Sequence, residues 1–197
     1  MISVQGQVAV DHNVAISAQK AVQKLGLEMM KGNFKFGQDR MYPRWKRRLA
    51  KRVGSMEQLE AQLAAAAQQK INMQLAVTAF NARLPTSFFS VWRAKKIDPR
   101  TGKPMRDATG REIIVDHWLA VVPTKTRVKF PDAKIPGKNY LLEEEGYTIA
   151  ISEKGANDWH FMTGLKPTIQ DLRSLFPTLP NTAKELGLPR SVAREIK

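Results

Sequence analysis

The sequence predicts an α+β domain in which helices precede an antiparallel sheet and cover it. Between residues 13 and 67, apolar residues recur every three or four positions, which is the period of amphipathic helices. Between residues 71 and 163, apolar residues alternate or form short runs separated by turn residues, a pattern typical of strands. The connections between these runs are short and favour antiparallel pairing. Helices segregated from such a sheet define the α+β class.

The first helix follows a short arm, residues 1–12, and either Asp11 or Asn13 can cap its start. Gly32 is suited to end it. Its expected buried stripe consists of Val14, Ala18, Ala21, Leu25 and Met29.

Two more helices are expected before the sheet. The second begins at Pro43, a residue favoured in a first helical turn, and ends at Gly54. The third begins with the capping-box spacing of Ser55 and Gln58. The inward residues of the second helix are Trp45, Leu49 and Val53, and those of the third are Leu59, Leu63, Ala66 and Ala67.

The strand region starts near Ile71, with one or two strands up to residue 92 that Pro85 interrupts. Residues 93–112 are polar and rich in turn pairs, which predicts a protruding hairpin or loop. The remaining strands are expected over residues 113–123, 124–130, 140–152 and 158–163, with a turn at 131–138.

A final helix capped by Thr168 buries Ile169, Leu172 and Phe176 and stops at Pro177. The sequence therefore predicts one domain over residues 13–180, between the arm 1–12 and a C-terminal tail, 181–197.

Charge is the most unusual property of the composition. The 197 residues include 32 Lys and Arg against 18 Asp and Glu, a net charge of +14. Such an excess attracts nucleic acid, acidic polysaccharide, anionic membrane surfaces or acidic proteins. The competing interpretation is a generally basic surface without a dedicated partner.

Several chemistries have no candidate residues. The chain has no cysteine, which excludes disulfides, thiol catalysis and Cys-ligated zinc. Its three histidines lack ligand spacing, and no glycine-rich nucleotide motif is present, so neither a metal nor a cofactor is expected.

Localisation depends on whether Met1 is the native start. No window approaches 18 consecutive apolar residues, so no membrane span is predicted. The N-terminus lacks the basic and apolar regions of a signal peptide. The protein is expected to be cytoplasmic if Met1 is native, and exported to the periplasm if a signal peptide has been removed.

Two groups of residues resemble a known family. The first joins Lys31-Gly32-Asn33-Phe34 to Asp39-Arg40-Met41-Tyr42-Pro43. The second runs from His117-Trp118-Leu119-Ala120 through Ala150-Ile151-Ser152 to Asp158-Trp159-His160-Phe161. They are similar to bacterial proteins with the nuclear-transport-factor-2-like (SnoaL-like) cone fold, of a largely uncharacterised group. In that group an early helix ends in a KGD turn, a YP opens the second helix, and a W-x-F strand closes the sheet.

The resemblance covers about residues 14–190 and implies a specific architecture. It implies a cone-shaped, curved antiparallel sheet packed by N-terminal helices, with a C-terminal helix. It also makes the cavity between sheet and helices the default site, and it implies a homodimer formed through the exposed sheet face. Candidate pocket residues are Trp45, Asp116, Trp118, Tyr140, Trp159 and His160, with Phe161 beside them. The competing interpretation is that the aromatic residues fill the core.

Acid–base chemistry would need a carboxylate and an imidazole on one face. Adjacent strand residues point to opposite faces, so Asp116 and His117 cannot act together. Only a cross-strand pair, Asp116 with His160 or His117 with Asp158, would serve. No catalytic residue is assigned.

The helix expected over residues 43–53 carries a second candidate site. Six of its residues form a basic set without an acid among them, Arg44, Lys46, Arg47, Arg48, Lys51 and Arg52. They are candidates for phosphate contacts, or a solvated outer face of a packed helix. Residues 93–112 add seven cations, and contact between the two sets would favour the polyanion site.

The sequence therefore predicts a non-catalytic binding or assembly module for a small apolar ligand or a protein partner. One alternative is a polyanion or nucleic-acid binder acting through the basic helix. The other is a cone-fold enzyme with an acid–base pair in its cavity.

Overall fold

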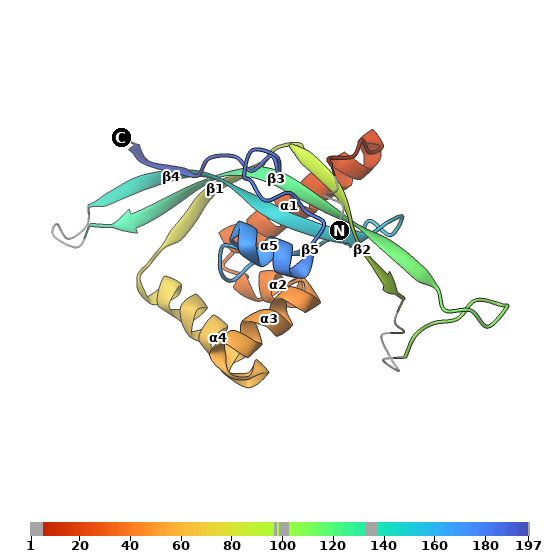
Figure 1. Ribbon diagram of the computed structural model, residues 1–197. Helices are drawn as coiled ribbons and strands as arrows, with labels where there is room; N and C mark the ends of the chain where they lie inside the picture. The colour runs from red at the N-terminus through yellow and green to blue at the C-terminus, as the bar shows by residue number, and fades with distance from the viewer. Residues whose placement is uncertain (1–5, 97, 99–102, 133–137, 197) are drawn as a thin grey trace.

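The computed structural model describes residues 6–96, 98, 103–132 and 138–196. Over these residues the chain forms helices and one open, six-stranded antiparallel sheet, which confirms the α+β class (Figure 1). Parts of four predicted segments lie outside the described residues: the arm before residue 6, residues 97 and 99–102 of segment 93–112, the turn at 133–137, and residue 197 of the tail.

Four helices lie where apolar periods predicted them, although Ala66, expected to face inward, is exposed, and one helix was not expected. They are α1 (His12–Met30), α3 (Pro43–Val53), α4 (Met56–Asn72) and α5 (Ile169–Leu175). The additional helix is α2 (Phe34–Asp39), whose six residues are too few to show a period. Helix α4 extends over Ile71, where the sequence predicted a strand, and it is followed by Gln74 with a positive φ of 52°.

Two long strands form the centre of the sheet. They are β3 (Ile114–Pro131) and β4 (Asn139–Glu153), paired in continuous register along most of their length. Strand β2 (Ser87–Lys95) pairs with the first half of β3, and β1 (Ala76–Ala82) with its second half. On the other side, β4 pairs with β5 (His160–Phe161) and with β6 (Val192–Ile196).

Pro123 lies inside β3 at the place where the neighbouring strand changes. Its carbonyl accepts a hydrogen bond from Arg83, in the connection between β1 and β2. The N–H and C=O of one antiparallel residue point the same way, so the missing N–H of Pro123 would also have faced this connection. A proline is therefore tolerated in the middle of an 18-residue strand.

Both faces of the central sheet are covered. Neighbouring residues of β3 point to opposite faces. Leu119 and Val121 pack with Trp45 of α3, while Ala120 packs with Val22 of α1. Helix α5 joins the first of these clusters. In Figure 1, α3, α4 and α5 lie together below the sheet, and α1 crosses behind it.

Gly26 allows α1 to lie directly on the sheet. A Cβ at this position would come within 1.9 Å of the Phe80 ring on β1. The absent side chain is therefore a packing requirement of the α1 face, beside the small residues Ala18 and Ala120.

The two ends of the chain are tied to the domain. In the arm, the Val8 amide donates to the Phe88 carbonyl at 2.9 Å. The segment expected as a tail, 181–197, instead contributes β6 to the sheet. Its pattern was too short and too polar to predict a strand. The last strand and β3–β4 form an arm that extends past the helices, at the left of Figure 1.

Segment 93–112 combines the end of one strand with a projection. Residues 93–95 belong to β2, which corrects the prediction for them. Farther out, Arg106 and Glu112 form an antiparallel bridge around a turn at Asp107. This part projects from the sheet at the lower right of Figure 1.

Within the described part of the chain, no helix is both long enough and apolar enough to cross a membrane.

Candidate polyanion-binding groove

The predicted pocket residues are distributed over both faces of the sheet. Trp45 is fully buried on the α3 face, and its Nε1–H donates to the Thr163 carbonyl at 2.8 Å. Trp159 is buried on the α1 face, where its Nε1–H donates to Ser17 Oγ at 2.9 Å. Tyr140 lies on the β3–β4 arm, 39% exposed, and stacks on Phe130. These three aromatic side chains do not share a cavity.

The titratable candidates have cationic or backbone partners. Asp116 lies 3.9 Å from Arg93 and 4.0 Å from Lys154, whose ammonium sits 4.1 Å from the Trp118 ring centre. His160 is half-buried, and its backbone stands opposite Ile151 of β4 in the sheet.

The two proposed carboxylate–histidine pairs are not brought together either. Asp158 forms an ion pair with Arg40. His117 contacts the Trp92 carbonyl through Nδ1 at 3.1 Å. The carboxylates of Asp116 and Asp158 therefore face cations where the acid–base hypothesis needed imidazoles.

A small, largely apolar cavity lies between α1, α2 and α4. Its volume of about 140 Å³ is below the roughly 300–1,000 Å³ of ordinary ligand sites. Its lining includes Leu25, Met29, Phe34, Met41 and Leu63. None of the six predicted pocket residues lines it.

The predicted basic helix, α3, has three cations with acidic partners. Lys46 pairs with Glu60 at 2.7 Å. Arg52 pairs with Asp171, and Arg48 Nε lies 3.6 Å from the same carboxylate. Burial raises the pKa of Asp171, but hydrogen bonds from Thr168 and Arg52 outweigh it and hold the pKa below its usual value. These cations hold α3 against α4 and α5.

The other three cations of α3 face a hollow. Arg47 and Lys51 are exposed and form no ion pair within the described residues. Arg44 donates to the Leu175 carbonyl at 3.0 Å. Together with Arg48 they surround a depression of about 290 Å³ beside the end of α5.

A second hollow adjoins the first through Arg44 and Arg47. It has a volume of about 490 Å³ and lies between the start of α3 and the ends of β2 and β3. Its lining includes Trp92, Lys95, Lys96, Val115, His117 and Glu153. The two hollows together are called the basic groove, with Arg44, Arg47, Arg48, Lys51, Trp92, Lys95 and Lys96 as its defining residues.

The groove keeps an excess of positive charge after its ion pairs are counted. Lys96 pairs with Glu153 at 2.9 Å, and Lys95 pairs with Glu112 at 2.7 Å. Arg47 and Lys51 remain without such partners among the described residues. Cations of α3 and of the end of β2 line one hollow, and such contact is the arrangement that favours the polyanion alternative.

Trp92 is the groove residue that the sequence did not single out. It ends the apolar run of β2 and is followed by Arg93, Lys95 and Lys96, so an aromatic residue beside cations was the available signal. The guanidinium of Arg44 lies 3.4 Å from its ring centre. Burial lowers the pKa of His117 below its usual value, so the imidazole is neutral at pH 7 and can donate Nδ1–H to the Trp92 carbonyl.

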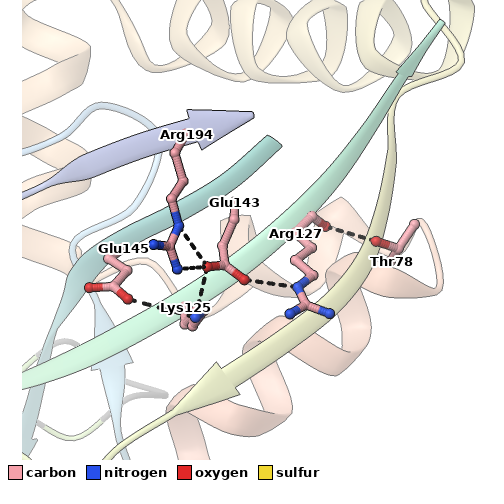
Figure 2. A network of polar contacts seen from close by, with 6 residues as sticks. All are labelled: Thr78, Lys125, Arg127, Glu143, Glu145 and Arg194. Atoms are coloured by element: carbon pink, nitrogen blue, oxygen red, sulfur yellow. Dashed lines mark hydrogen bonds and ion pairs between the residues drawn. The ribbon is translucent and has the colours of Figure 1, made fainter. Parts of the chain in front are cut away.

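A second basic cluster, on the β3–β4 arm, is gathered around one buried acid. Figure 2 shows Glu143 of β4 between Lys125 and Arg127 of β3 and Arg194 of β6. The carboxylate lies 2.7 Å from Lys125, 2.9 Å from Arg127 and 2.6 Å from Arg194. Their hydrogen bonds lower the pKa of Glu143 to about 2. Because Glu143 bonds cations from two neighbouring strands, it ties β6 to the sheet.

Among the described residues, no group of three His, Asp or Glu side chains stands close enough to hold a metal ion.

No family model, curated protein or solved structure matches this chain. The groove's own residues therefore carry the functional argument.

Proposed function

We propose that this protein is a non-catalytic binding module that holds a polyanion in the basic groove. The observation that supports this most is the pair Arg47 and Lys51, exposed and without ion pairs among the described residues, in a row with Arg44. The three residues are spaced i, i+3 and i+7, which places them along one side of α3. Such a row can follow a chain of phosphates or sulfates.

One groove cation, Arg48, has a buried donor atom without a hydrogen bond, although its side chain as a whole is 35% exposed. Arg48 Nε is buried and forms no hydrogen bond, with Asp171 at 3.6 Å as its nearest acid. A buried donor without a partner is uncommon and costly. The exposed part of Arg48 lines the smaller hollow, so an anion bound there would meet this side chain beside Arg47 and Lys51.

The test is a charge reversal with a matched control. The double variant Arg47→Glu with Lys51→Glu removes the two unpaired cations and leaves Arg48 and Asp171 intact. The control, Lys20→Glu with Lys184→Glu, makes the same change in net charge at exposed positions outside the groove lining.

Binding of heparin and of a fluorescent oligonucleotide would be measured at 150 mM salt, with thermal melts of each variant. The groove variant is expected to lose at least tenfold in affinity and the control less than threefold. Stability should change by only about 0.5 kcal/mol per site, because these side chains are exposed. Equal losses in both variants would contradict the proposal and indicate attraction by net charge alone.

The cone-fold relationship is a proposal of its own. Helices preceding a twisted antiparallel sheet, with a fifth helix after it, are compatible with that architecture. Helices on both faces of the central sheet leave less free surface for the dimer that the resemblance implies. A molar mass by light scattering would decide between a monomer and that dimer, and an experimental structure would test the curvature of the sheet.

A further inference from the structure

The position of Trp92 depends on a bulge in β2. Val91 pairs with His117 and Ala94 with Val115, so Trp92 and Arg93 together stand opposite the single residue Asp116. Such an extra residue redirects the side chains around it. Regular alternation would place Trp92 with Phe88 on the α1 face. The bulge instead turns it to the α3 face, where it meets Arg44.

The backbone at this bulge adopts an unfavourable conformation. Trp92 has φ of 48°, in the left-handed region that bulky residues rarely occupy. The hydrogen bond from His117 Nδ1 to its carbonyl, 3.1 Å long, holds that conformation. Strained residues of this kind cluster at binding sites, where the surrounding structure maintains them.

The result is a flat aromatic surface inside a cationic groove. Trp92 remains 39% exposed, although one of the largest apolar side chains would gain from burial. The guanidinium of Arg44 stacks 3.4 Å from its ring centre. Arg47, Lys95 and Lys96 line the same hollow. An aromatic ring set among cations is how proteins hold unpaired bases and their phosphates together.

We infer that the groove binds single-stranded nucleic acid, with a base stacked on the Trp92–Arg44 pair and the adjoining phosphates on Arg47 and Lys51. This inference rests on the proposed function and narrows its ligand. In a duplex the bases are paired and stacked inside, so they cannot reach a ring in a groove. A sulfated polysaccharide would use the cations alone and would not need the tryptophan.

The experiment compares three polymers and three variants. The polymers are a 15-nucleotide oligothymidylate, a DNA hairpin duplex with the same number of phosphates, and heparin. The variants are Trp92→Leu, which keeps an apolar side chain without a ring, Trp92→Phe, which restores a ring, and Tyr140→Ala. Tyr140 is the matched control because it is equally exposed, at 39%, but lies on the β3–β4 arm.

Trp92→Leu is expected to weaken oligothymidylate binding by between about 5-fold and about 150-fold, the range measured for loss of one stacked base. Trp92→Phe should recover most of this affinity, and Tyr140→Ala should have no effect. Heparin binding should be the same in all three variants. The single strand should bind the unmodified protein more tightly than the duplex, and it should quench tryptophan fluorescence in a way that Trp92→Phe abolishes.

Two results would overturn the inference, and they differ in whether the proposed polyanion-binding function survives. If Trp92→Leu leaves single-strand affinity unchanged while reversal of Arg47 and Lys51 removes it, stacking is absent but the polyanion groove remains. If no polymer binds the unmodified protein at 150 mM salt, or if the groove variant loses no more affinity than the Lys20 and Lys184 control, the proposed function fails together with the inference. Thermal melts of each variant separate these results from loss of folding.

Discussion

Two basic regions of this protein differ in whether their cations are paired with acids. On the β3–β4 arm, Lys125, Arg127 and Arg194 converge on the carboxylate of Glu143. In the basic groove, Arg47 and Lys51 have no ion pair among the described residues. Both regions are basic, but only the groove has cations without an acidic partner among the described residues.

This comparison shows that the net charge of a region does not by itself identify a binding site. A cation that already bonds a carboxylate has fewer N–H donors free for a phosphate, and its field is partly cancelled by that carboxylate. The arm cluster therefore serves to attach β6, whereas the groove can attract an anion without a competing partner.

The largest expected effect comes from removing the support of the groove. Trp45→Ala would delete a fully buried ring and its hydrogen bond to Thr163, and it should lower the free energy of unfolding by about 3–5 kcal/mol. Groove binding should be lost with it, because Trp45 anchors α3. Chemical denaturation would measure the loss, and a change below about 1 kcal/mol would mean that α3 does not depend on this anchor.

The second largest effect is expected in the salt dependence of binding, which should involve the groove and not the arm. If four groove cations neutralise phosphates of a single strand, raising salt from 50 to 200 mM should weaken binding by about 50-fold. Replacing Arg194 by Gln on the arm should leave this dependence unchanged, since that residue is committed to Glu143. A shallower slope in the Arg194 variant would place part of the ligand on the arm and remove the distinction.

Removing Glu143 should give the β3–β4 arm what distinguishes the groove, namely cations without an acidic partner. Glu143→Gln would leave three cations close together without a carboxylate, so β6 should detach more readily and its amides should exchange faster with solvent. The control is Glu145→Gln, because Glu145 is half-exposed and its one ion pair among the described residues is with Lys125, at 3.7 Å. Hydrogen exchange with equal protection of β6 in both variants would show that the network does not hold the strand.

The smallest effect is the dependence of this network on pH. The pKa of Glu143 is about 2 in the folded protein and 4.5 ordinarily. Its stabilising contribution is therefore complete above pH 4.5, decreases as the pH falls from 4.5 towards 2, and is lost below 2. Melting temperatures of the unmodified protein and of Glu143→Gln should converge over this interval. A difference in melting temperature that stays constant over this pH range would contradict the lowered pKa of Glu143.

Local patterns allowed much of the fold to be predicted. The capping residues Asp11 and Thr168 and the apolar stripe of α3 depend on residues only a few positions apart, and the structure has each of them in place. Helix α2 and strand β6 were missed because each has too few residues for a period to appear. The six cations of α3 were visible for the same local reason.

The sequence by itself determined that α3 is an amphipathic helix with one apolar and one cationic side. Only the tertiary structure decided which cations form ion pairs, because their acidic partners are remote in sequence. Asp171, for example, lies 119 positions from Arg52 along the chain. It also decided the place of Trp92, since the bulge arises from the pairing of β2 with β3 and has no signature in β2 alone. Periodicity is a property of neighbouring residues and can be recognised in the sequence. Ion pairing depends on distances in space, which the sequence does not contain.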